Sequence, residues 1–227
     1  MINQSQAQIY LANARRQRQT KGYHCWSVFN AENYQEKTST ILGTLFLFNY
    51  QILAPNHSTT MVTHADCIYY ILPLYGGIHL EDEHYNEKLI LSQKIEQIVP
   101  ENPAKFEISN PFEENISLLT IAFKQQTNKL KNQLLSFNFK ENNKLIPIFE
   151  NKIACTYIGN FDGRKEAAYP LKNKQNSIFV YIIQGAFEFE NRLLEAGDAL
   201  SLKEIEAVEW EALSENALLL LIEIQLA

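Results

Sequence analysis

The chain has 227 residues, 46% of them hydrophobic and 11% aromatic, which is enough to bury one large core or two small ones. Its net charge of −6 disfavours a protein that binds nucleic acid through many phosphate contacts. The three cysteines are widely spaced and form no Cys-x-x-Cys pair, so a reducing compartment is expected and a disulfide framework is not. No apolar run approaches the roughly 20 residues of a membrane-spanning helix. We therefore expect a cytoplasmic protein that contacts neither nucleic acid nor a membrane.

The first half of the chain is predicted to consist of β-strands. Residues 41–53 are rich in β-branched and aromatic side chains and end at the turn formers Ala54-Pro55-Asn56. Residues 67–74 form a second apolar run. Pro73 lacks a backbone N–H, so we expect this strand to end, bulge or lie at a sheet edge there. Further strands are predicted at residues 94–99, 105–109 and 116–123.

Residues 125–150 are a compositional break, rich in Asn, Lys and Gln, and are predicted to connect two domains over the surface. Scattered leucines within residues 130–135 allow one or two helical turns. The expected division is therefore an N-terminal domain of residues 1–124 and a C-terminal domain of residues 151–227.

Strands resume after this segment, at residues 153–158. The run Phe187-Glu188-Phe189-Glu190 alternates, so its phenylalanines should face the core and its glutamates the solvent. We expect a tight hairpin turn at Asn191-Arg192 and another turn at Gly197-Asp198. Residues 217–224 are predicted to be a strand that is buried on both faces.

One hairpin unit occurs twice in the chain. Setting Gly185 over Gly76 aligns the residues that follow, for example Phe187 with Ile78. Short strands with regular turns favour barrels or sandwiches over α/β alternation. The sequence therefore predicts an all-β fold with two similar antiparallel barrels.

Several segments resemble a known family. The glycine-led hairpin that is followed by the Leu-x-x-Gly-Asp turn of residues 194–198 resembles the cupin superfamily. The chain is similar over most of its length to the pirin-like bicupins, which include bacterial quercetin 2,3-dioxygenases. Residues 26–29 (WSVF) resemble the family's Trp-His-Thr-Phe segment. His64-Ala65-Asp66 followed by Gly76 matches the end of its metal motif, and Asn110-Pro111 matches a turn after its second ligand pair. The resemblance implies a bicupin of two jelly-roll-like barrels.

The chain departs from this family at the metal ligands. Metal-binding members use a His-x-His pair and a later His-x-Glu pair in the N-terminal barrel. His64 keeps one of these four positions, and the alignment places Val62, Phe106 and Ile108 at the other three. Because a first-row metal needs several converging ligands, we expect the metal site to be lost and no cofactor to be bound.

The resemblance and the departures together predict a non-catalytic protein with a binding or regulatory role. Its partner is expected to be a small apolar molecule or another protein. No catalytic residue is assigned, and the oligomeric state is left open. The candidates for a ligand pocket all belong to the N-terminal barrel and are His64, Asp66, Tyr70, Phe106, Ile108 and Trp26. The simpler interpretation of His64 is a vestige that is hydrogen-bonded to Asp66 or to the backbone.

Two alternatives remain. The first is a quercetinase-type dioxygenase with one divalent, iron-like metal in a rearranged site, for instance one that contains His57 and His64. The second is a purely structural or interaction protein whose N-terminal barrel is filled. The basic cluster of residues 15–18 is expected to be solvated surface.

Overall fold

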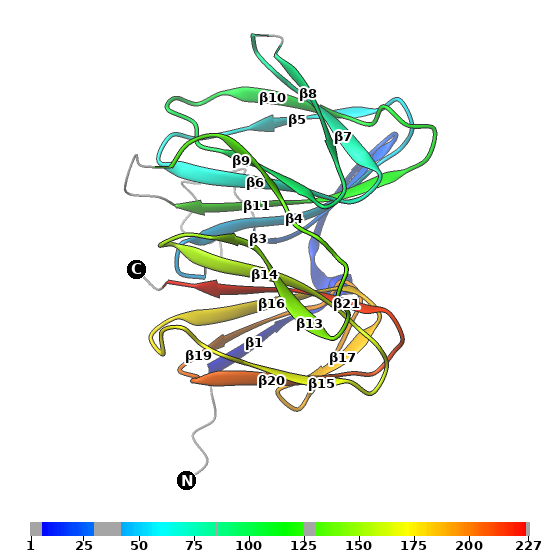
Figure 1. Ribbon diagram of the computed structural model, residues 1–227. Coiled ribbons are helices and arrows are strands. Elements are labelled where there is room, and N and C mark those ends of the chain that lie inside the picture. Colours follow the sequence, from blue (N-terminus) through cyan, green and yellow to red (C-terminus); the bar gives the residue numbers. More distant parts are fainter. Residues whose placement is uncertain (1–5, 30–41, 85, 125–129, 226–227) are drawn as a thin grey trace. The chain divides into compact units, whose positions relative to one another are not determined.

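A computed structural model describes residues 6–29, 42–84, 86–124 and 130–225. These residues form two compact β units (Figure 1). The C-terminal unit contains the described residues among 1–15, 42–44 and 137–227, and the N-terminal unit contains those among 16–41 and 45–136. The described chain has one short 3₁₀ helix (Ala12–Ala14), and none of its helices has the length and apolarity needed to cross a membrane.

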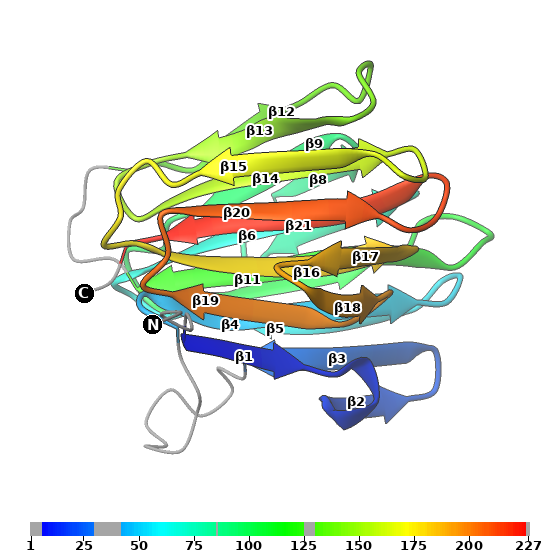
Figure 2. The same cartoon turned by 90° about the horizontal axis from the view of Figure 1, so that it is seen from below.

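The C-terminal unit consists of two antiparallel sheets, in agreement with the all-β prediction (Figures 1 and 2). The six-stranded sheet has the order β1 (Gln6–Tyr10), β19 (Ala199–Lys203), β16 (Ser177–Gln184), β21 (Ala217–Ile224), β14 (Ala154–Phe161) and β13 (Lys144–Glu150). The four-stranded sheet has the order β15 (Glu166–Pro170), β20 (Ala207–Ala212), β17 (Ala186–Phe189) and β18 (Arg192–Glu195).

The N-terminal unit has the same two-sheet plan. Its seven-stranded sheet has the order β12 (Gln133–Ser136), β9 (Lys94–Ile98), β6 (Cys67–Tyr75), β11 (Ile116–Lys124), β4 (Leu45–Leu53), β3 (Tyr23–Phe29) and β2 (Arg16–Thr20). Its four-stranded sheet has the order β5 (Ser58–Val62), β10 (Lys105–Ser109), β7 (Gly77–Asp82) and β8 (Glu87–Leu91). All these neighbours pair antiparallel.

The division of the chain differs from the predicted one at the N-terminus. The break at residue 136 lies inside the predicted connection, but residues 6–15 belong to the C-terminal unit. The reason is long-range pairing, because β1 forms the edge of the six-stranded sheet beside β19 (Figure 2). The helical turns predicted within residues 130–135 are wrong for the same kind of reason, since β12 pairs with β9 as an edge strand.

The repeated hairpin is confirmed at its glycines. Gly76 joins β6 to β7 and Gly185 joins β16 to β17, and their φ angles are 75° and 78°. Residues other than glycine rarely adopt this left-handed backbone conformation. A Cβ atom at Gly185 would also lie 2.3 Å from Ser214 Oγ, and one at Gly76 would lie 2.8 Å from Ile116 Cγ2. Both hairpins therefore need glycine at the same structural position.

Two local predictions have different outcomes. Pro73 does coincide with an irregularity, because β6 continues to Tyr75 but its register with β11 shifts opposite Ser117 and Leu118. The hairpin turn predicted at Asn191-Arg192 is wrong by one residue. The turn consists of Glu190 and Asn191, whose φ angles of 50° and 59° are the pair of positive values that a two-residue hairpin turn requires.

The C-terminal unit has a filled apolar core. Phe187 and Phe189 are fully buried whereas Glu188 is exposed, as the alternation predicted. The Trp210 ring stacks on Phe189 with ring centroids 5.5 Å apart and meets Phe161 edge-on at 5.6 Å. These aromatic pairs fill the space between the two sheets of the unit.

Two carboxylates are buried in this unit, those of Asp198 and Glu223. Glu223, on the core-facing side of β21, accepts hydrogen bonds from Tyr169 Oη at 2.6 Å and Asn176 Nδ2 at 2.7 Å. It also accepts the backbone N–H groups of Lys172 and Asn173, each at 3.0 Å. Burial alone would raise the pKa of Glu223, but these hydrogen bonds hold it below its ordinary value. The carboxylate thereby fixes the segment between β15 and β16.

We predict that Glu223→Gln lowers the free energy of unfolding of the C-terminal unit by about 2 kcal/mol near neutral pH, because an amide NH₂ would face hydrogen-bond donors. The folded-state pKa is lowered, so the stabilisation is present above the ordinary pKa of 4.5 and is lost as the pH falls through the lowered value. The difference in unfolding free energy between the wild type and Glu223→Gln should therefore become smaller in acid. Urea denaturation in a Trp26→Phe background lets Trp210 report on this unit. Exposed Glu188→Gln is the control, and an equal loss there would contradict the prediction.

Candidate functional site

A cavity of about 390 Å³ lies in the N-terminal unit. Its wall comes from strands of both sheets together with His64, which follows β5. The polar residues that line it are Arg18, Tyr23, Asn49, Gln51, Thr59, Thr60, His64, Tyr69 and Thr120. The apolar ones are Leu47, Met61 and Val62. The cavity therefore combines polar and apolar surface.

Strand register brings the polar groups of the seven-stranded sheet together. Asn49 on β4 is paired with Thr120 on β11 and with Ser27 on β3. Gln51, two residues further along β4, is paired with Cys25. Because side chains alternate along a strand, Asn49 and Gln51 project from the same face, towards the cavity.

A chain of hydrogen bonds runs along this wall. Arg18 Nη2 donates to Tyr23 Oη at 3.1 Å, and the Tyr23 hydroxyl donates to Gln51 Oε1 at 3.0 Å. Gln51 Nε2 then donates to Thr120 Oγ1 at 2.6 Å. Burial, with a smaller contribution from Cys25, raises the pKa of Tyr23 to about 12 against the lowering effect of Arg18. The phenol therefore stays protonated and remains a donor near neutral pH.

Two further groups of the cavity bear on its chemistry. The side-chain oxygen of Asn49 is buried and has no hydrogen-bond partner within the described part of the chain. His64 is half-buried, and its backbone N–H donates to Tyr69 Oη at 3.0 Å. An unpaired buried acceptor costs stability unless a ligand or water satisfies it.

The sequence-predicted pocket residues are distributed over several surfaces. His64 lines the cavity. Trp26 lies on the face of β3 that points away from the cavity, where its ring stacks on His24 with centroids 3.6 Å apart. Tyr70 lies on the opposite face of β6 from Tyr69 and meets Phe123 edge-on. Asp66 is exposed, with a positive φ of 59°.

The positions aligned with metal ligands do not converge on His64. Ile108 is fully buried in the apolar core, and Phe106 packs against the same core. Val62 is half-exposed and is paired with Lys105, so it lies on the other face of β5 from Met61. Phe106 and Asp66 border a second, separate hollow in this unit.

The side chains present do not fit a metal centre. The described ranges contain no group of three or more His, Cys, Asp or Glu side chains that could hold a metal ion. His57, considered for a rearranged site, has its Nδ1 atom 2.8 Å from the Pro55 carbonyl oxygen. One imidazole among hydroxyl and amide groups is a weak donor set for a first-row metal.

The sequence reasoning missed Arg18, Tyr23, Asn49, Gln51 and Thr120. A signal for two of them existed, since Asn49 and Gln51 stand two residues apart in the otherwise apolar run of residues 45–53. The other three are recognisable only from the pairing of β2, β3 and β11 with their neighbours.

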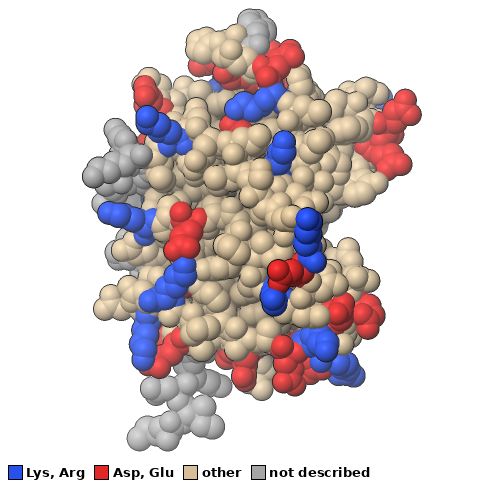
Figure 3. Space-filling view, in the orientation of Figure 1, with Lys and Arg blue, Asp and Glu red and all other residues tan. Residues whose placement is uncertain are grey.

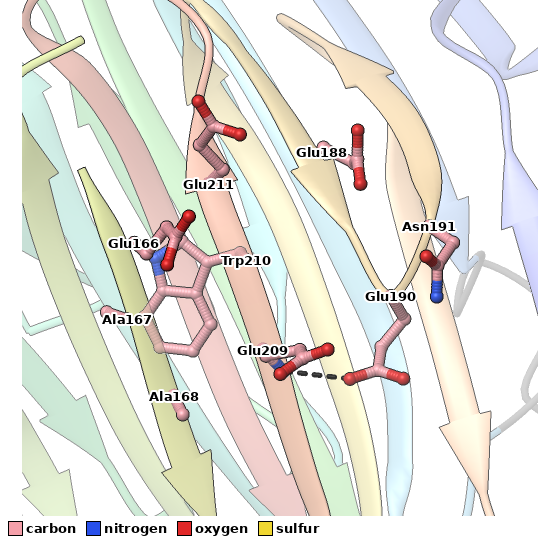
Figure 4. Close-up of a pocket in the computed structure, with 9 residues that line it drawn as sticks. All are labelled: Glu166, Ala167, Ala168, Glu188, Glu190, Asn191, Glu209, Trp210 and Glu211. Carbon is pink, nitrogen blue, oxygen red and sulfur yellow. Dashed lines mark hydrogen bonds between the residues drawn. The ribbon is translucent and has the colours of Figure 1, made fainter. Parts of the chain in front are cut away.

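A second hollow lies on the outer face of the four-stranded sheet in the C-terminal unit. Figure 3 shows Asp and Glu side chains gathered at the end of the molecule where this sheet lies. The carboxylates that line the hollow are those of Glu166, Glu188, Glu190, Glu209 and Glu211 (Figure 4). Arg164 pairs with Glu211 at 3.2 Å, and Glu190 Oε1 accepts the backbone N–H of Glu209 at 2.8 Å. This is a solvated acidic face of the sheet.

Comparison with known proteins identifies the C-terminal part of the chain. Residues 150–224 match the family model of the quercetinase C-terminal cupin domain. No curated protein matches the sequence significantly.

Solved structures show the same fold at low sequence identity. YhhW from Escherichia coli has a TM-score of 0.85 and 14% identity, over 98% of this chain and 99% of that one. The bacterial pirin YhhW from Escherichia coli in complex with nickel(II) has a TM-score of 0.83 and 14% identity, over 98% and 100%. Quercetin 2,3-dioxygenase from Acinetobacter baumannii has a TM-score of 0.74 and 11% identity, over 97% and 79%. Residues 150–224 thus match a quercetinase C-terminal cupin domain, and the chain has the fold of these solved structures.

Proposed function

We propose that this pirin-like cupin is a metal-independent binding protein, whose N-terminal unit holds a small molecule in the cavity beside His64. The observation that carries the proposal is the polar wall formed by Tyr23, Gln51 and Thr120 beside the apolar core of this unit. Buried polar groups bring little net stability, whereas a few well-placed polar groups in an apolar cavity are typical of ligand sites.

The size of the cavity supports binding over a purely structural role. Small-molecule sites usually have volumes of about 300–1,000 Å³, and this cavity has about 390 Å³. A structural protein was expected to have a filled N-terminal barrel. The mixed wall also favours a ligand with hydrogen-bonding groups over the purely apolar one that the sequence suggested.

The side chains at the positions that would ligate a metal support a metal-independent role. Of the structures with the same fold, one is a bacterial pirin in complex with nickel(II) and another is a quercetin 2,3-dioxygenase. In this chain Phe106 and Ile108 instead extend the apolar core. A quercetinase-type reaction would need donors that the described residues do not bring together.

We predict that the purified chain retains far less than one metal ion per molecule after incubation with nickel, iron, manganese or copper followed by desalting. Elemental analysis measures the ratio, and an oxygen electrode with quercetin should record no consumption above the protein-free rate. His64→Ala is the matched variant and should remove any residual metal affinity. Stoichiometric metal that is lost in His64→Ala would restore the dioxygenase alternative.

We also predict that the hydrogen-bond chain is dispensable for folding. Gln51→Leu alone leaves the Tyr23 and Thr120 hydroxyls without their partner and should cost about 1–3 kcal/mol of unfolding free energy. The triple variant Tyr23→Phe, Gln51→Leu, Thr120→Val removes the whole chain and should return to within about 1 kcal/mol of the wild type. Urea denaturation followed by circular dichroism compares the three proteins. A triple variant less stable than Gln51→Leu would show that the chain serves the fold.

A further inference from the structure

We propose that the ligand of this cavity is an uncharged alcohol, whose hydroxyl group is bound by Asn49 and Thr120 on the inner face of the seven-stranded sheet. This inference rests on the proposed binding function and names the chemical class of the ligand. The two residues are direct partners on β4 and β11, and both line the cavity. One of them offers an acceptor and the other a donor that the described part of the chain leaves unused.

Asn49 supplies the acceptor. Its side-chain oxygen is buried and accepts no hydrogen bond from the described residues. The next inward side chains of β4 give it no partner, because Leu47 is apolar and the amide of Gln51 is engaged with Tyr23 and Thr120. A buried carbonyl oxygen without a donor costs stability, so this position calls for a donor from a bound molecule.

Thr120 supplies the donor. The hydrogen bonds of this wall run in one direction, because the Tyr23 hydroxyl donates to Gln51 Oε1 and Gln51 Nε2 donates to Thr120 Oγ1. Thr120 Oγ1 is therefore the acceptor in its bond with Gln51, and a threonine hydroxyl still has one hydrogen to donate. No hydrogen bond among the described residues uses that hydrogen, although Thr120 is only 3% exposed. It is thus available to a molecule in the cavity.

A hydroxyl group fits this pair better than most other polar groups do. Its oxygen accepts from Thr120 while its hydrogen is donated to Asn49 Oδ1, so one atom completes both bonds. An ether or a ketone cannot donate to Asn49, and a carboxylate would place its negative charge against that oxygen. An ammonium group cannot accept from Thr120, and the described lining contains no Asp or Glu to pair with it. The wall therefore selects an uncharged group that both donates and accepts.

The remainder of the lining indicates a compact, apolar body. Leu47 lies two residues from Asn49 on the same face of β4, and Met61 lies on β5 of the other sheet of this unit. At about 390 Å³ the cavity is near the small end of ligand sites, which favours a molecule with one ring or a short chain. A purely apolar molecule would leave Asn49 unpaired, and a sugar would set its other hydroxyl groups against apolar side chains.

The test compares alcohols with their methyl ethers on the full-length protein. Benzyl alcohol with benzyl methyl ether and cyclohexanol with cyclohexyl methyl ether are suitable pairs, since methylation removes the donor and keeps the oxygen and the hydrocarbon body. Calorimetry or ligand-observed NMR measures each affinity. We expect at least one alcohol to bind about tenfold tighter than its ether, although the ether is the more hydrophobic molecule. The preference should fall to within about threefold in Asn49→Leu.

Two further variants make the result specific. Asn49→Asp keeps an acceptor and adds a negative charge, so benzylamine should bind about tenfold tighter to this variant than to the wild type. Ser117→Ala removes a hydroxyl group from the other face of β11, at a residue that does not line the cavity, so the preference should persist. Asn49→Leu removes an unpaired buried acceptor and should fold at least as well as the wild type, which circular dichroism checks.

The outcomes separate this inference from the proposed function. Alcohol and ether that bind equally well, or a preference that survives Asn49→Leu, would overturn the hydroxyl inference and leave binding in the cavity intact. Benzamide that binds tighter than benzyl alcohol would also overturn it, in favour of a primary amide. If none of these compounds binds at concentrations up to about 10 mM, both proposals fail.

Discussion

Each unit of this protein buries one face of nearly every strand between two sheets, and a polar side chain at an inward position must find its partner inside that space. Three examples illustrate this. Glu223 is satisfied by four donors. Glu96 on β9 pairs with Lys88 at 2.6 Å, although burial raises the pKa of Glu96 against the effect of that lysine. The third place is the wall of the N-terminal cavity, where Gln51 links Tyr23 to Thr120.

The two units differ in what occupies the space between their sheets. In the C-terminal unit the aromatic rings of Phe161, Phe189 and Trp210 fill the space between the sheets, and the Glu223 carboxylate near the end of β21 binds the segment between β15 and β16. In the N-terminal unit the corresponding space is left partly open and is lined by hydroxyl, amide and guanidinium groups. One unit therefore has a filled apolar core, whereas the other has a cavity with a partly polar wall.

The chain has the fold of the bacterial pirin YhhW, and its described residues bring together no group of three or more His, Cys, Asp or Glu side chains that could hold a metal ion. Ile108 has become part of the apolar core, and Val62 faces away from it. The potential ligand-binding groups come instead from β2, β3, β4 and β11, on the inner face of the larger sheet. One barrel fold can carry different chemistries in its interior, because every strand supplies inward positions.

The sequence by itself determined the strand-rich fold, the repeated hairpin at Gly76 and Gly185, and the inward placement of Phe187 and Phe189, since these depend on local conformational limits and on the two-residue period of a strand. It also predicts a departure from the metal motif. Only the tertiary structure decided that β1 joins the C-terminal unit and that β12 is a strand, because edge pairing depends on chain segments far apart in sequence. The same holds for the candidate site. Arg18, Gln51 and Thr120 are unremarkable alone, and cross-strand register makes them one surface.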